Sequence, residues 1–158
     1  MAYDAIVHGA RGILYWGAER IDDPAFRTSL YAVTAELGAL SSSLAGAEVD
    51  EVRVRAIPEV EDRVGRGVRA MLRRQGNEFV LILVNEDATP QMGVEVEGLS
   101  ALEGRTLTLL YGEERISVGR GRLVTRLPGY EVKVFATDPR WVASPRAGRD
   151  YGVVASAP

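Results

Sequence analysis

Residues 8–17 read HGARGILYWG, and they mark the point where this chain changes from helical to extended structure. Gly9 can adopt the left-handed conformation that ends a short helix over residues 2–7. The apolar run Arg11–Trp16 is strand-like, with Leu14 and Trp16 on one face. The segment therefore predicts a helix followed by a strand.

A long amphipathic helix is predicted from Pro24 to Ala45. Asp23 supplies an N-cap carboxylate, and Pro24 fits the first helical position. Apolar side chains recur at steps of four and three and form one stripe: Phe26, Leu30, Val33, Leu37, Leu40 and Leu44. Residues 1–46 thus form a helix–strand–helix unit, which is an α/β order.

After Val49 the hydrophobic period becomes two, which is typical of strands. Phe79–Val84 is continuously apolar and predicts a central strand buried on both faces. Similar short runs, separated by glycine and proline turns, are 52–56, 68–73, 92–96, 106–111, 115–118, 122–127 and 131–136. The predicted fold class is mainly β, an antiparallel β-sandwich over residues 47–137 preceded by the helix–strand–helix unit. Residues 138–158 are rich in proline, glycine and small residues and are predicted to be an irregular tail.

Composition excludes several classes of protein. The net charge of −3 predicts no attraction to nucleic acid or to anionic membranes. The chain has no cysteine, which excludes disulfides and thiolate metal sites, and His8 is its one histidine. We therefore expect no metal site and no cofactor. Because the sequence contains no membrane span and no signal peptide, a cytoplasmic protein is expected.

Three stretches together resemble the C-terminal part of clan-A-type glycoside hydrolases, the β-galactosidase-like and related families. They are HGARGILYWG, the helix containing Ala35-Glu36-Leu37, and LLYGEERISVGRGRLVTRLPGYEVKVFA at residues 109–136. The resemblance covers nearly all of residues 1–137. It implies that residues 1–46 are a remnant of the last βα unit of a (β/α)₈ barrel, and that the sandwich is an accessory domain.

The same resemblance indicates which residues touch a sugar. Trp16 would be a sugar platform at the end of a barrel strand, and Glu19 would bind a hydroxyl from the loop that follows. The acid/base and nucleophile glutamates of such families lie near the ends of barrel strands four and seven, so both would precede Met1, and no catalytic residue is expected here. From the residues alone, Trp16 could instead plug a small core, and Glu19 could lie in a solvated loop.

Three functions follow from these observations. The first is a non-catalytic accessory or assembly module related to a glycoside hydrolase. The second is a small glycosidase whose site is assembled between subunits or with a partner chain, and the third is a carbohydrate-binding module that uses Trp16 or Trp141. An isolated strand over Arg11–Trp16 would have two unpaired edges, which predicts a homodimer or a barrel-domain partner.

Overall fold

The computed structural model describes residues 1–17, 20, 22–49, 51–56, 67–88 and 91–138. Within these residues, nine strands form two antiparallel sheets. The larger sheet has the order β1-β3-β4-β9-β6-β7: β1 (Ala47–Glu48), β3 (Val68–Gln75), β4 (Glu78–Asn85), β9 (Val132–Ala136), β6 (Thr106–Leu109) and β7 (Arg115–Ser117). The smaller sheet has the order β2-β5-β8: β2 (Arg53–Ala56), β5 (Gln91–Glu97) and β8 (Leu123–Leu127). The predicted mainly-β sandwich is confirmed.

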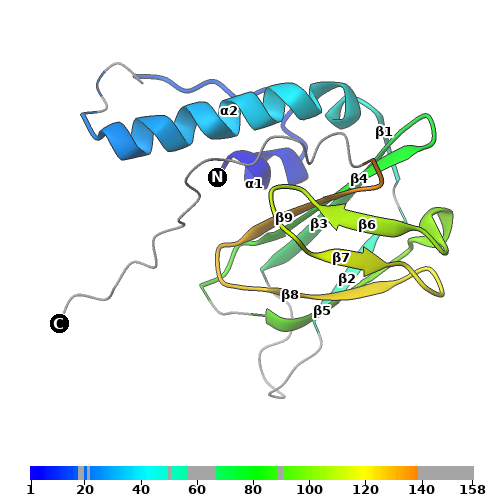
Figure 1. Ribbon diagram of the computed structural model, residues 1–158. Helices are drawn as coiled ribbons and strands as arrows, with labels where there is room; N and C mark the ends of the chain where they lie inside the picture. Colours follow the sequence, from blue (N-terminus) through cyan, green and yellow to red (C-terminus); the bar gives the residue numbers. More distant parts are fainter. Residues whose placement is uncertain (18–19, 21, 50, 57–66, 89–90, 139–158) are drawn as a thin grey trace.

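Strand β4 is the centre of the molecule, and it is buried on both faces as predicted. It pairs with β3 on one side and β9 on the other. Phe79, Leu81 and Leu83 enter the core between the two sheets. Val80, Ile82 and Val84 enter a second core on the opposite face. This division produces three layers, in which the larger sheet lies between the smaller sheet and the helices (Figure 1).

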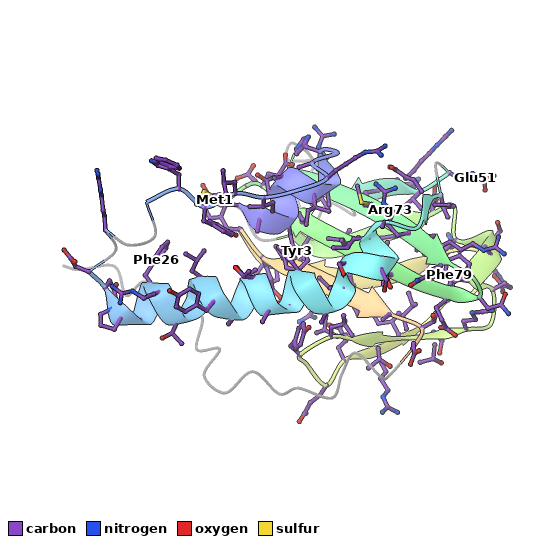
Figure 2. The ribbon with its side chains drawn as sticks, turned by 90° about the horizontal axis from the view of Figure 1, so that it is seen from above. Met1, Tyr3, Phe26, Glu51, Arg73 and Phe79 are labelled. Carbon is purple, nitrogen blue, oxygen red and sulfur yellow. The ribbon has the colours of Figure 1, made fainter. Side chains whose placement is uncertain are left out.

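Two helices, α1 (Ala2–Val7) and α2 (Pro24–Leu44), cover the outer face of the larger sheet (Figure 1). Leu40 of α2 and Tyr3 of α1 are buried in the second core. Val33, Leu37 and Leu44 of the predicted stripe also pack against this core. Leu30 is buried outside this core, and Phe26 is 51% exposed. Phe26 lies in the first turns of α2, which extend past the edge of the sheet (Figure 2). The stripe is therefore covered only where the sheet reaches it.

Local signals set the helix ends that the sequence predicted. The Asp23 carboxylate accepts hydrogen bonds from the backbone N–H groups of Ala25 and Phe26, at 2.8 and 3.2 Å. Gly9, at φ 93°, ends α1. The N–H groups of Gly9 and Ala10 donate to the carbonyls of Ile6 and Ala5, the pair of bonds that closes a Schellman motif.

The predicted strand over Arg11–Trp16 is not formed. In the structure these residues have no β pairing and connect the two helices. A strand needs a neighbour, but β4 is already flanked by β3 and β9, and β1 occupies the edge beside β3. Leu14 and Trp16 are consequently exposed, so Trp16 does not plug a core. Trp141 and the rest of the predicted tail from 139 onward lie outside the described residues.

The described part of the chain contains no helix long and apolar enough to cross a membrane.

Truncating β4 on either face should destabilise the protein to a similar extent. Leu81 and Ile82 are both fully buried, on opposite faces of the strand. We expect Leu81→Ala and Ile82→Ala each to lower the free energy of unfolding by about 2–5 kcal/mol, since each leaves a cavity. Urea unfolding measures both losses. Val124→Ala on the exposed face of β8 is the control and should cost less than about 0.5 kcal/mol. A small loss for Ile82→Ala would contradict a helical layer that packs on β4.

Candidate functional site

The most distinctive surface feature is a group of four exposed apolar side chains between residues 14 and 31. Leu14 is 86% exposed, Trp16 93%, Phe26 51% and Tyr31 61%. We call these four residues the N-terminal apolar set. They lie on the connection between the helices and on the first part of α2. Exposed apolar side chains that form a contiguous patch mark interaction surfaces.

The structure describes only one of the two residues predicted to bind a sugar. Trp16 lies on the surface with its ring exposed, and the backbone turns directly after it at Gly17, where φ is 75°. Glu19 lies outside the described residues. The sugar contact of Trp16 and Glu19 therefore stays a prediction.

A polar site lies at the edge of the sandwich, between β8 of the smaller sheet and β9 of the larger sheet. Here Glu114, Thr125 and Lys133 form a connected group beside a depression of about 470 Å³, which Val124 and Arg126 also line. Lys133 Nζ donates to Glu114 Oε2 at 2.6 Å and to Thr125 Oγ1 at 3.2 Å. Thr125 Oγ1 in turn donates to Glu114 Oε1 at 2.9 Å. We call these three residues the edge triad.

Strand alternation explains why the edge triad points inward. Leu123, Thr125 and Leu127 are the buried positions of β8, and Lys133 precedes the core residues of β9. Lys133 is only 9% exposed, so its ammonium group depends on the Glu114 carboxylate for its charge balance. The edge triad thus links the two sheets by charged hydrogen bonds. The pattern VKVFA, with the chain's one lysine inside an apolar run, is the signal that could have predicted it.

Glu131 and Glu103 are carboxyl groups with shifted pKa values. Burial raises the pKa of Glu131, the positive charge of Lys133 lowers it, and the Glu114 carboxylate raises it further. In contrast, backbone N–H groups of Arg120 and Gly121 lower the pKa of Glu103, which is fully exposed. These N–H groups lie 2.9 and 2.6 Å from the Glu103 carboxylate oxygens. Glu103 therefore closes the turn before β8.

Comparison with protein-family models and with curated proteins finds no match. Solved structures, however, share the fold. A noncanonic maltogenic α-amylase from Thermotoga neapolitana matches 85% of this chain with a TM-score of 0.58 and 16% sequence identity. An α-amylase from Geobacillus thermoleovorans, solved with acarbose, matches 72% with a TM-score of 0.54 and 14% identity. An Anoxybacillus α-amylase matches 68% with a TM-score of 0.50 and 19% identity.

The matches cover only part of each enzyme. The chain spans 22% of the Anoxybacillus enzyme, 23% of the Geobacillus enzyme and 35% of the Thermotoga enzyme. A match over 85% of 158 residues exceeds the 112 residues from 47 to 158, so it includes part of the helical unit as well as the sandwich. The fold is therefore one that occurs within glycoside hydrolases. The three enzymes are α-amylases. They support a glycoside hydrolase-like fold, but they do not point to the β-galactosidase-like families.

Removing the Glu114 carboxylate should destabilise the sandwich, because the positive charge of Lys133 then stays buried without a partner. Glu114→Gln leaves the buried Lys133 ammonium without its counter-ion, and we expect a loss of about 1–3 kcal/mol in the free energy of unfolding. Adding Lys133→Met to Glu114→Gln should recover most of this loss, because no unpaired charge remains. Glu113→Gln, at the exposed neighbouring position, is the matched control. Equal effects of Glu113→Gln and Glu114→Gln in urea unfolding would contradict a structural role for the ion pair.

The two shifted carboxyl groups should affect stability with opposite dependence on pH. The folded protein holds the Glu131 proton above the ordinary pKa of 4.5, so this residue's contribution to stability falls as pH rises from 4.5 through the raised pKa. Glu103 stabilises the fold above its ordinary pKa of 4.5, and that stabilisation is lost as pH falls through the lowered pKa. Relative to the wild type, Glu131→Gln should therefore gain stability with rising pH, whereas Glu103→Gln should lose it.

Urea unfolding at a series of pH values around 4.5 measures both differences. Parallel curves for the wild type and Glu131→Gln would show that this carboxyl group is not shifted in the folded protein.

Proposed function

We propose that this chain is a non-catalytic accessory and assembly module of a glycoside hydrolase, corresponding to the C-terminal part of such an enzyme. In this proposal the sandwich is the accessory domain that follows a (β/α)₈ catalytic barrel, and the N-terminal apolar set contacts that barrel. The observation that carries the proposal is the combination of a glycosidase-type fold with apolar side chains left uncovered on its helical side.

The shared fold supports the first half of the proposal. The chain corresponds to between about a fifth and a third of three α-amylases, and the best-covered match extends into the helical unit. A module of this size, related to one portion of a larger enzyme, suits an accessory role. Retaining or inverting hydrolysis needs two carboxyl groups that flank the scissile bond, and Glu114 is already held by Lys133 and Thr125.

The position of the apolar groups supports the second half. The core between the two sheets is buried, with side chains from β4, β9 and the smaller sheet. The helical layer, in contrast, covers the sheet with one face and leaves Leu14, Trp16 and Phe26 in water. Covering three such side chains would contribute several kcal/mol, at about 1.5–3 kcal/mol for each large apolar group. A catalytic barrel is proposed as the partner because the chain corresponds to only 22–35% of the three α-amylases, so most of each enzyme lies outside the matched part.

The chain alone should not hydrolyse glycosides. We expect a panel of aryl glycosides and maltooligosaccharides to give no turnover above the blank, because the edge triad holds the one glutamate of the depression in an ion pair. A robust rate that Glu114→Gln abolishes and Glu113→Gln leaves intact would contradict the proposal. It would favour the alternative of a small glycosidase. Calorimetric sugar binding without turnover, lost in Trp16→Ala, would favour a carbohydrate-binding module instead.

Docking is tested on the N-terminal apolar set. We expect the DNA directly upstream to encode a (β/α)₈ barrel, and the co-expressed barrel to form a one-to-one complex with this chain in light scattering. Trp16→Asp and Leu14→Asp should each abolish the complex, because a carboxylate cannot be buried there unpaired. Val124→Asp, at an exposed apolar position of the smaller sheet, should leave it intact. A chain that stays monomeric in the presence of the barrel would contradict the proposed docking. A homodimer that these variants leave unchanged would contradict it as well.

A further inference from the structure

Three side chains of types that can bind a metal ion meet at the junction of α1 and β4, and none of them belongs to the edge triad or to the N-terminal apolar set. Asp4 and His8 lie one helical turn apart on α1 and its C-cap, and Glu86 directly follows β4. His8 and Glu86 are 78 residues apart in the sequence. Their imidazole nitrogen and carboxylate oxygens all lie within 4.8 Å of one another.

The geometry of these donors is close to that of a coordination shell. His8 Nε2 lies 2.5 Å from Glu86 Oε1 and 3.9 Å from Asp4 Oδ1. Ligands about 2.0–2.2 Å from a Zn²⁺ ion lie roughly 3–3.5 Å from one another. The first distance must widen and the second must shorten by less than about 1 Å. The three side chains are partly exposed: His8 at 51%, Asp4 at 41% and Glu86 at 26%. They can therefore make these changes by rotation without disturbing the core.

The backbone on both sides of this junction is held in place. The Schellman bonds from Gly9 and Ala10 fix the end of α1 on which His8 lies. The N–H groups of Asn85 and Glu86 donate to the carbonyls of Glu131 and Gly67, at 2.9 and 2.6 Å. The three side chains therefore start from fixed Cα positions, so little backbone order has to be gained when an ion binds.

We propose that Asp4, His8 and Glu86 form a binding site for a divalent transition-metal ion of the zinc class. One imidazole nitrogen and two carboxylate oxygens suit Zn²⁺, whereas Ca²⁺ and Mg²⁺ prefer oxygen ligands alone. Three protein ligands in a partly exposed position leave a place for water, as in open zinc sites. The expectation of no metal site was based on the single histidine, and the fold supplies the two carboxylates that the histidine lacks.

A simple hydrogen bond between His8 and Glu86 is the competing explanation, and Arg69 distinguishes it from a metal site. Arg69 Nε lies 3.7 Å from Glu86 Oε2, so this guanidinium competes with a metal ion for the same carboxylate. Removing Arg69 should therefore strengthen metal binding. For a pair without a metal function, Arg69→Ala would leave the weak binding of Zn²⁺ unchanged.

The test is calorimetric titration of the full chain, without a polyhistidine tag, with Zn²⁺. We expect one ion per chain, affinity at least about tenfold weaker in His8→Ala, Asp4→Asn and Glu86→Gln, and tighter binding in Arg69→Ala. Glu113→Gln, at an exposed carboxylate elsewhere, is the matched control and should bind as the wild type does. Zn²⁺ should also raise the melting temperature of the wild type but not of His8→Ala, since a ligand of the folded state stabilises it.

A second readout does not depend on affinity. With one histidine in the chain, the imidazole gives a single set of nitrogen resonances, and Zn²⁺ should shift it while Mg²⁺ does not. Absence of both heat and shift would overturn the proposal. So would wild-type Zn²⁺ affinity in a folded His8→Ala variant. The result is independent of the accessory function, because neither measurement involves a sugar or a barrel.

Discussion

The structure depends on the need to cover strand β4 on both faces. Its side chains from Phe79 to Val84 are all nearly fully buried, and they divide alternately between two cores. A strand of this kind cannot be a surface element of a two-layer sandwich, because one apolar face would remain in water. In the described part of the chain, the sandwich covers one face and the helices of residues 1–46 cover the other. The helical unit is thus required by the sequence of β4.

The helical layer solves that problem incompletely. Helix α2 is longer than the part of the sheet beneath it, so the buried positions Leu30 and Leu40 are followed, toward the N-terminus, by the half-exposed Phe26. The connection before α2 leaves Trp16 and Leu14 exposed as well. A fold that buries one face of its helices and exposes apolar groups elsewhere on the same layer is suited to docking. These exposed side chains are the physical basis of the accessory and assembly role that we propose.

Local sequence patterns predicted much of this fold, but they did not predict contacts between residues that are far apart in the sequence. Phe79–Val84, the Asp23 cap and the turn at Gly9 each carry their signal within a few residues, and all three are confirmed. Arg11–Trp16 has the composition of a strand but no partner to pair with, and pairing is decided by the rest of the sheet. Lys133 with Glu114, and His8 with Glu86, are brought together only by the topology. A one-dimensional pattern does not contain that proximity.

Hydrogen exchange of the backbone amides tests most directly the claim that β4 is the common centre of both cores. We expect amides of β4 and of the second half of α2 to exchange most slowly, at the rate of global unfolding, because neither layer can open without exposing β4. Amides of residues 11–17 should exchange fastest. If α1 and α2 exchanged far faster than β4, the helices would be a separate appendage. The sandwich would then be stable without them, contrary to the central claim.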